Sequence, residues 1–229
     1  MLVTSYYDIY AKPEKFMEHI YIFYDLLSSG IPITIFTDPS LVKKFLIFPP
    51  SVKVISMPLQ TFIRYSISTK YDREPNISAV KDTTEFLAIM NSKIEFILKA
   101  SEILTDDTFI WVDFGILKIC KNPDRFIKKL KDMNEKTFDK IMMPRYWSSV
   151  NQVNWKFCSG VFIIPRKHIQ TFYYHSKKVL SDFCNLPQNK LTWENNVLNI
   201  IKIFTTDDII KLYFADHDDS ILLNIDSVL

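Results

Sequence analysis

The sequence predicts a single α/β domain over residues 1–229, with a mostly parallel central sheet flanked by helices. Short apolar runs alternate with amphipathic stretches, the order expected of repeated strand–helix–strand units. One run, residues 109–112, is apolar at every position, which is typical of a strand buried on both faces. The chain has 229 residues, 48 % of them hydrophobic, enough for one such domain with a full core.

The N-terminal half begins with alternating strands and helices. We expect strands at residues 2–7, 33–37 and 52–56, which are rich in β-branched and aromatic side chains. A helix is expected at residues 13–27, because Pro13 suits a first helical turn and apolar side chains recur on one face. Gly30 should end this helix. Residues 62–76 are irregular and polar, and we expect an exposed loop there.

The next segment, residues 83–104, has the clearest helical periodicity and is expected to form one helix. After the buried strand, the same criteria predict further helices and strands, with a polar, aromatic loop at residues 146–154. The helices are expected at residues 123–130, 166–183 and 193–203, and the strands at residues 140–143, 157–164 and 209–215. The sequence shows no internal repeat and no linker, which favours one domain.

Composition narrows the class of protein. Lys and Arg number 28 and Asp and Glu 26, giving a net charge of +2 with basic residues scattered, so charge alone does not indicate nucleic-acid binding. The three cysteines are odd in number and lack C-x-x-C spacing, which favours free thiols in a reducing compartment. Neither a signal peptide nor an apolar run of about 18 residues occurs. The sequence therefore predicts a cytoplasmic protein without a membrane segment.

Candidate ligand-binding residues lie where predicted strands end. In open α/β sheets, ligands bind outside the carboxyl ends of the strands. The polar residues and glycines at these positions would converge at one edge of the sheet. They are Tyr7 and Asp8, Asp38, Asp113 and Gly115, and Asp216 and His217, together with Ser159 and Gly160, which interrupt the predicted strand at residues 157–164.

Asp113 directly follows the buried strand and could bind a divalent cation or a ribose hydroxyl. Gly115 would let a diphosphate approach the backbone. The alternative interpretation is a strand-terminal Asp in an ordinary turn, because so short a motif often occurs by chance. A protein kinase is excluded, since the sequence has neither a glycine-rich loop nor a His-Arg-Asp segment.

Three further residues each have a structural and a functional interpretation. His217 lies among acidic residues that suit a divalent cation, or it belongs to an exposed acidic turn. Glu194 lies at the start of a predicted helix. Its carboxylate either interacts favourably with the positive end of the helix dipole or points at a reacting hydroxyl group. Lys93 lies on a helical surface or points at a phosphate.

Seven segments, taken in order, resemble those of the HtrL/YibB-type glycosyltransferase family. They are residues 3–9, 33–38, 91–93 (Asn-Ser-Lys), 111–115 (Trp-Val-Asp-Phe-Gly), 158–162 (Cys-Ser-Gly-Val-Phe), 193–194 (Trp-Glu) and 215–217 (Ala-Asp-His). The same order is similar to the retaining GT-A glycosyltransferases of the glycogenin type. The resemblance covers nearly the whole chain, although no single motif is specific.

This resemblance implies a GT-A-like (Rossmann-like) fold and assigns roles to residues. Asp113 matches the first acid of an Asp-x-Asp motif and His217 the metal-binding His, so a divalent Mn²⁺ or Mg²⁺ is implied. Gly115 replaces the second acid, so Asp216 or Asp218 would have to supply the missing oxygen, or the site works without a metal. The remaining matches are Ser159 and Gly160 facing the sugars, Glu194 beside the transferred sugar, Lys93 at the donor sugar or phosphate, and Tyr7 and Asp8 at the base and ribose.

The implied function is a glycosyltransferase that moves a sugar from a nucleoside-diphosphate sugar, with a UDP-sugar favoured, to an acceptor hydroxyl. Asp113 and Glu194 would be the catalytic carboxylates, the metal would assist diphosphate departure, and Arg64 or Arg73 would add charge near phosphate. The alternative is a non-catalytic nucleotide- or sugar-binding protein that keeps the fold with a degraded metal motif. A hydrolase with a metal at His217 would need more His ligands.

Overall fold

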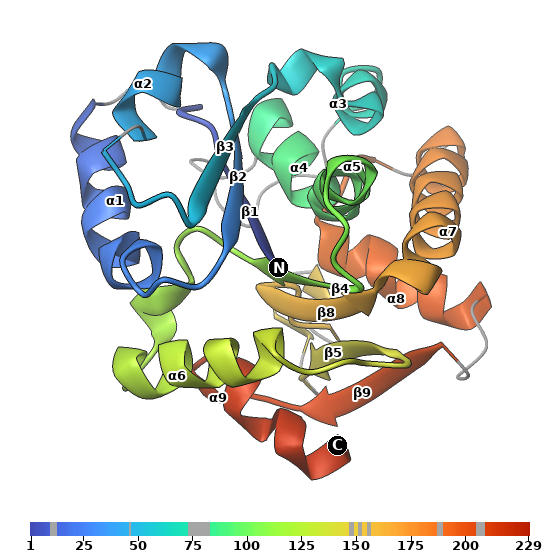
Figure 1. The fold of residues 1–229 in the computed structure, drawn as a ribbon. Helices are drawn as coiled ribbons and strands as arrows, with labels where there is room; N and C mark the ends of the chain where they lie inside the picture. The colour runs from blue at the N-terminus through green and yellow to red at the C-terminus, as the bar shows by residue number, and fades with distance from the viewer. Residues whose placement is uncertain are drawn as a thin grey trace.

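A seven-stranded sheet with helices on both faces forms the centre of the molecule (Figure 1). The computed structural model describes residues 1–9, 13–45, 47–72, 83–146, 149–150, 153–154, 157–186, 190–204 and 209–229. The strand order is β3-β2-β1-β4-β8-β5-β9. These strands are β1 (Leu2–Tyr6), β2 (Ile33–Thr37), β3 (Val52–Ser56), β4 (Thr108–Val112), β5 (Ile141–Arg145), β8 (Val161–Pro165) and β9 (Ile210–Phe214).

Strand directions determine which residues meet at each edge of the sheet. Strand β1 is parallel to β2 and β4, β2 to β3, and β5 to β9. Strand β8 is antiparallel to both of its neighbours, β4 and β5. The predicted α/β fold with a mostly parallel sheet is therefore confirmed. The carboxyl ends of the other six strands share one edge with the amino end of β8.

Alternate residues of each strand enter two separate hydrophobic cores, because successive side chains of a strand point to opposite faces. In β4, Ile110 and Val112 enter the first core, whereas Phe109 and Trp111 enter the second. The first core is closed by α1 (Pro13–Leu27), α2 (Val42–Phe45), α6 (Pro123–Asn134) and α9 (Ser220–Leu223). The second is closed by α3 (Ile63–Ser68), α4 (Thr84–Asn91), α5 (Lys93–Ile103), α7 (Arg166–Asn185) and α8 (Glu194–Phe204).

The predicted single helix at residues 83–104 is wrong, because it is two helices that meet at Ser92. This residue has φ −90° and ψ 0°, and its hydroxyl donates to the Ala88 carbonyl oxygen at 2.7 Å. Asn91 likewise donates from Nδ2 to the Leu87 carbonyl oxygen. Such side-chain bonds to preceding carbonyls compete with the helical ladder. The break makes Lys93 the first residue of α5.

The predicted loop at residues 62–76 is also partly wrong, because α3 occupies Ile63–Ser68. The Glu95 carboxylate accepts hydrogen bonds from the backbone N–H groups of Ile63, at 3.0 Å, and Arg64, at 3.3 Å. These donors lie in the first turn of a helix, where they need partners from outside the helix. The partner here is more than 30 positions away, so no local sequence pattern predicts this helix.

Other boundaries shift by a few residues. Helix α6 runs on to Asn134, β5 continues through Pro144, and β8 begins at Val161 and not at residue 157. The loop expected at residues 146–154 contains a small hairpin, β6 (Ser149–Val150) and β7 (Val153–Asn154). Gly30, with φ 78°, follows α1 as expected. Within the described part of the chain, no helix is long and apolar enough to cross a membrane.

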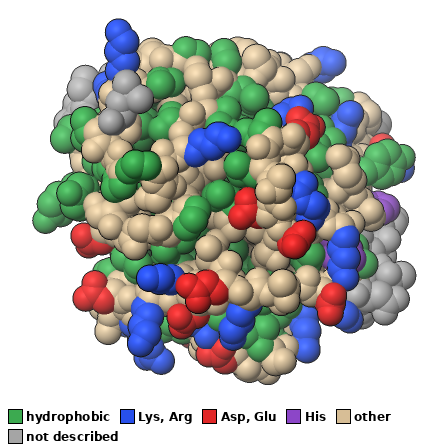
Figure 2. Space-filling model, viewed as in Figure 1, with side chains coloured by type: hydrophobic (Ala, Val, Ile, Leu, Met, Phe, Trp, Pro, Cys, Tyr) green, Lys and Arg blue, Asp and Glu red, His purple; other side chains and the backbone are tan. Residues whose placement is uncertain are grey.

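Charged side chains of both signs are mixed on the surface. Figure 2 shows acidic and basic side chains interspersed in the lower half of this face, where α6 and α9 lie. Ion pairs near α6 and α9 include Lys121 with Asp218, and the mostly buried Lys129 with the exposed Asp226. This face therefore agrees with the scattered charge in the sequence and presents no broad basic surface.

Candidate functional site

Asp113 and Gly160 bring two strands together at the centre of the carboxyl edge. The Asp113 backbone N–H donates to the Gly160 carbonyl oxygen at 2.8 Å, which joins the end of β4 to the start of β8. Because Asp113 follows Trp111 by two positions, both side chains lie on the face covered by α5. Trp111 Nε1 donates to Asp113 Oδ1 at 2.6 Å and fixes the carboxylate.

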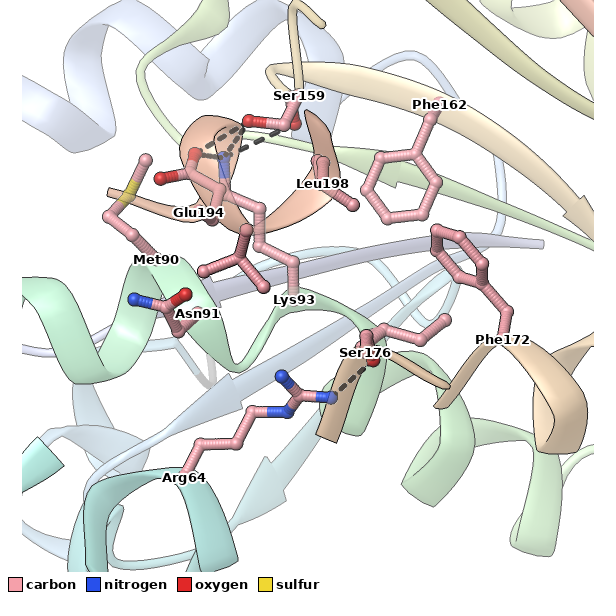
Figure 3. A pocket seen from close by; sticks show the side chains of 12 residues that line it. Arg64, Met90, Asn91, Lys93, Ser159, Phe162, Phe172, Ser176, Glu194 and Leu198 are labelled. Carbon is pink, nitrogen blue, oxygen red and sulfur yellow. Dashed lines mark hydrogen bonds and ion pairs between the residues drawn. The ribbon is translucent and has the colours of Figure 1, made fainter. Parts of the chain in front are cut away.

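The Lys93 ammonium lies between two carboxylates. Its Nζ is 2.9 Å from Asp113 Oδ1, 3.0 Å from Asp113 Oδ2 and 2.9 Å from Glu194 Oε1. It also donates to the carbonyl and hydroxyl oxygens of Ser159, both at 3.2 Å. The Ser159 hydroxyl in turn donates to Glu194 Oε1 at 2.6 Å (Figure 3). We call these residues, with Trp111, the Lys93 cluster.

The Lys93 cluster extends from the surface into the interior. The Asp113 side chain is 30 % exposed, whereas those of Lys93 and Glu194 are 5 % and 6 % exposed. Burial lowers the pKa of Lys93, but the charges of Asp113 and Glu194 outweigh it and raise the pKa above its usual value. Lys93 is therefore a cation. With both carboxylates ionised, the cluster has a net charge of −1.

A bond outside the cluster sets the distance between Lys93 and Glu194. Asn91 Nδ2 donates to the Thr192 carbonyl oxygen at 3.0 Å, joining the end of α4 to the segment before α8. Lys93 follows Asn91 by two positions, and Glu194 follows Thr192 by two. The break at Ser92 and this bond together direct both side chains to the same point.

A cavity of about 30 Å³ lies beside the cluster, bordered by Asn91, Lys93, Glu194 and Arg64. It is large enough for an ordered water and much smaller than a nucleotide. Two buried acceptors near it, Glu194 Oε2 and Asn91 Oδ1, have no hydrogen-bond partner among the described residues. A ligand larger than water would therefore have to widen this space.

Arg64 was expected on an exposed loop near phosphate, but it is a buried residue of α3. Its side chain is 1 % exposed, and its Nη2 donates to Ser176 Oγ (Figure 3). Its Nε is 3.9 Å from Glu95 Oε2. Arg64 thus belongs to the packing between α3, α5 and α7. Arg73 lies outside the described residues.

Tyr7 and Asp8, expected near the base and ribose, and Asp38, a further candidate for nucleotide-sugar binding, lie outside the Lys93 cluster. The Tyr7 hydroxyl donates to the Met57 carbonyl oxygen at 2.8 Å, and its side chain is buried. Asp38 Oδ1 accepts from the backbone N–H of Ser40 at 3.0 Å and caps a short 3-10 helix, η1 (Pro39–Leu41). Asp8 is partly buried, just beyond β1. All three are at the carboxyl edge, as the strand directions require.

The two candidate glycines differ in their surroundings. A Cβ on Gly160 would lie 3.0 Å from Ile116 Cδ1 and 3.3 Å from Ile221 Cδ1, so a larger residue there would require both isoleucine side chains to shift. A Cβ on Gly115 would meet only Lys118 Cδ, at 4.0 Å. The space beside Gly115 is therefore open, which is compatible with the predicted approach of a ligand.

The acidic segment after β9 contacts the turn that follows it and the segment before α6. Asp216 and His217 are exposed, and Asp218 Oδ2 is 2.8 Å from Lys121 Nζ. Asp218 Oδ1 accepts from the Ser220 N–H at 2.9 Å, and Asp219 accepts from the backbone N–H of residue 122. These contacts fix the start of α9.

The implied metal site does not fit the side chains present. Asp113, Asp216 and His217 do not form a group that could hold a metal ion, and neither do any other three His, Cys, Asp or Glu residues in the described ranges. Both Asp113 oxygens already contact the Lys93 ammonium. The use of Mn²⁺ or Mg²⁺ stays a prediction that this arrangement does not support.

Sequence reasoning gave no individual role to three residues that shape the site, namely Trp111, Asn91 and Thr192, although the first two stand in segments that carry the resemblance. The two-residue spacing between Trp111 and Asp113 in a strand is a signal that could have identified the first. Asn91 and Thr192 are 101 positions apart, and only the folded chain shows that they pair.

Comparisons with solved structures find chains of similar architecture at low identity. A glycosyltransferase involved in the glycosylation of the major capsid of PBCV-1 has a TM-score of 0.49 and 11 % identity over 93 % of this chain and 80 % of its own. The apo form of the glycosyltransferase GlyE of Streptococcus pneumoniae TIGR4 has a TM-score of 0.46 and 14 % identity. This alignment covers 92 % of the present chain but only 44 % of GlyE.

A CMP:2-keto-3-deoxy-manno-octonic acid synthetase complexed with CTP has a TM-score of 0.45 and 13 % identity, over 94 % of this chain and 89 % of its own. No protein-family model and no curated protein sequence matches the chain. The resemblance to the HtrL/YibB-type family therefore stays a prediction. Since these TM-scores are below 0.5, we base the function on the site itself.

Proposed function

We propose that this protein is a glycosyltransferase that moves a sugar from a nucleoside-diphosphate sugar, with a UDP-sugar favoured, to an acceptor hydroxyl. The observation that carries the proposal is the contact of Lys93 with Asp113, Ser159 and Glu194 at the carboxyl edge. Ligands of open α/β sheets bind at this edge. The ordered resemblance of seven segments supports the same class of enzyme.

Each member of the Lys93 cluster has a role in this proposal. Asp113, at the outer end of the cluster, accepts hydrogen bonds from hydroxyl groups of the nucleoside-diphosphate sugar. Glu194 Oε2 has no partner among the described residues and is the acceptor for a hydroxyl that enters the cavity. Lys93 holds both carboxylates in place and limits their mutual repulsion. Two carboxylates near one sugar can stabilise a positively charged transition state.

The nucleotide would lie over the ends of β1, β2 and β4. Tyr7, Asp8 and Asp38 border this part of the edge, and the open space beside Gly115 would admit the diphosphate. The Ser159 hydroxyl and the Gly160 segment would face the transferred sugar. The cavity of about 30 Å³ is smaller than a hexose, so donor binding requires it to widen.

The test is release of nucleoside diphosphate from UDP-sugars and GDP-mannose, followed by chromatography, for the wild type and Asp113→Asn. We expect turnover or slow donor hydrolysis in the wild type, and a loss of at least about 100-fold in the variant. Equal rates in both proteins would remove Asp113 from the mechanism. The matched control is Asp139→Asn, which changes an exposed carboxylate paired with Lys167.

The second candidate, a non-catalytic nucleotide- or sugar-binding protein, is favoured by the small cavity and by the burial of Lys93 and Glu194. A structural ion-pair network can have this form without any chemistry. Stabilisation of the folded protein by UDP without turnover of any donor would identify this candidate.

A further inference from the structure

We infer that this site binds its ligand without a divalent metal, because the Lys93 ammonium occupies the cation position beside Asp113. The part that concerns nucleotide binding rests on the proposed function. The part that concerns the metal rests on the Lys93 cluster alone, and the two can be tested separately.

The first argument is the set of oxygens around Lys93. Five oxygen atoms lie 2.9–3.2 Å from Nζ: two of Asp113, two of Ser159 and one of Glu194. Carboxylate, hydroxyl and carbonyl oxygens are the usual ligands of a hard divalent cation. An ammonium has three N–H donors, and here they are shared among acceptors from three residues. The lysine therefore fills a space that suits a cation.

The second argument is the electrostatic effect of Lys93 on any metal at Asp113. Trp111 Nε1 and Lys93 Nζ both contact Asp113 Oδ1, and Lys93 also contacts Oδ2. A metal bound to either oxygen would lie within about 5 Å of the ammonium, given a metal–oxygen distance of about 2.1 Å. Repulsion between these cations is strong at a partly buried site, where water screens little.

The third argument is the lack of further ligands. Gly115 has no side chain to offer, and Asp218 is paired with Lys121 and Ser220. Among the residues that the structure describes, no three His, Cys, Asp or Glu side chains form a metal-binding group. A metal at Asp113 would thus have one carboxylate and a neighbouring cation, which is a poor site.

The inference predicts a gain of metal binding when Lys93 is removed. In Lys93→Met, the carboxylates of Asp113 and Glu194 would face each other across the space that the ammonium occupied. Two carboxylates and the Ser159 oxygens are ligands of the type that suits Mn²⁺. The matched control is Lys99→Met, which removes an exposed lysine from the same helix, where it pairs with Glu102.

The experiment is a titration with Mn²⁺ alone, followed by calorimetry and by the Mn²⁺ electron paramagnetic resonance signal. We expect no stoichiometric binding below millimolar Mn²⁺ by the wild type or Lys99→Met, and at least tenfold tighter binding by Lys93→Met. Adding Asp113→Asn to Lys93→Met should abolish this gain. Stoichiometric Mn²⁺ binding by the wild type that Asp113→Asn removes would overturn the inference, and so would a folded Lys93→Met without any gain.

If Lys93→Met does not fold, the comparison of Mn²⁺ binding by the wild type and by Asp113→Asn still tests the inference. A second measurement, thermal stabilisation by UDP in EDTA or in Mn²⁺, separates the two proposals. Equal stabilisation in both supports the inference, and stabilisation only in Mn²⁺ overturns it while the proposed function stands. If no nucleotide stabilises the protein, the result counts against the proposed function. The titration with Mn²⁺ alone then still tests whether the site binds a metal.

Discussion

Asn91 and Thr192 are joined by a hydrogen bond of 3.0 Å between Asn91 Nδ2 and the Thr192 carbonyl oxygen, although 101 positions separate them. Each lies two residues before a charged member of the Lys93 cluster. This bond therefore sets the position of Lys93 relative to Glu194, which are 2.9 Å apart at Nζ and Oε1. Replacing Asn91 tests whether the pair is needed for the site.

Asn91→Ala should lower the free energy of unfolding by about 1–3 kcal/mol, because it leaves a buried carbonyl of Thr192 without its donor. Urea denaturation measures this loss. Asn224→Ala, which removes an exposed amide bonded to the Phe214 carbonyl oxygen, is the control and should change stability by no more than about 0.5 kcal/mol. Equal effects of the two substitutions would contradict the proposed link between α4 and α8.

Glu194→Gln should separate activity from stability. The amide keeps the size of the carboxylate but removes one of two negative charges beside Lys93, so the cluster becomes neutral. We expect transfer to fall by at least about 100-fold, whereas the free energy of unfolding should stay equal or rise. Initial rates of nucleotide release and urea denaturation of the same preparations measure both quantities. A strongly destabilised variant would indicate that Glu194 mainly serves the fold.

The parts of the fold that follow local patterns could be predicted from the sequence. The strand at residues 109–112 and the helix at residues 13–27 show their own periodicity, and the structure confirms both. The break at Ser92 could not be predicted, because the apolar spacing continues through it while side-chain bonds interrupt the ladder. Helix α3 was missed because Glu95 caps it from a distant segment.

In the candidate site, too, some features follow from local sequence patterns and others depend on tertiary contacts. The rule on strand ends selected Asp113, which lies at the carboxyl edge. Ser159 and Gly160, expected inside a strand, reach the same edge because they precede β8, which is antiparallel to its neighbours. That rule does not specify which side chains touch across the edge. Lys93 and Glu194 lie at the starts of two helices, and their contact depends on tertiary packing. Asp216 and His217 reach the same edge without forming a metal-binding group with Asp113.

Gly160→Ala should be much more disruptive than Gly115→Ala. The new methyl at Gly160 would lie 3.0 Å from Ile116 Cδ1, between two buried isoleucines, and should cost about 1–3 kcal/mol of stability. At Gly115 the nearest atom is 4.0 Å away and φ is −100°, so alanine should change stability by less than about 0.5 kcal/mol. Thermal and urea denaturation compare the pair directly. Equal stabilities would show that Ile116 and Ile221 can move aside.

If the space beside Gly115 admits a diphosphate, Gly115→Ala should instead weaken nucleotide binding. Its stability without ligand should match the wild type, but its stabilisation by UDP should be smaller. Calorimetric titration with UDP measures the difference. An unchanged dissociation constant would place the diphosphate elsewhere on the edge.

The ion pair at the start of α9 should give a pH-dependent contribution to stability. Hydrogen bonds from Lys121 and Ser220 lower the pKa of Asp218 from 3.8 to about 2. A carboxylate whose pKa is lower in the folded than in the unfolded protein stabilises the folded state at pH values above its unfolded-state pKa. This stabilisation is lost as the pH falls toward the folded-state pKa. Because Asp218 lies near the surface, we expect only about 0.5–1 kcal/mol from it at neutral pH.

Asp218→Asn isolates this charge, since asparagine still accepts a hydrogen bond from the Ser220 N–H. The stability difference between wild type and variant should be constant above about pH 5 and shrink steadily toward pH 2. Urea denaturation at a series of pH values measures it. Lys121→Met should remove the largest share of this pH-dependent part, because the bond from Lys121 is the largest cause of the pKa shift, whereas the bonds from Ser220 remain. A difference that grows as the pH falls would show that the stabilising species is the protonated acid.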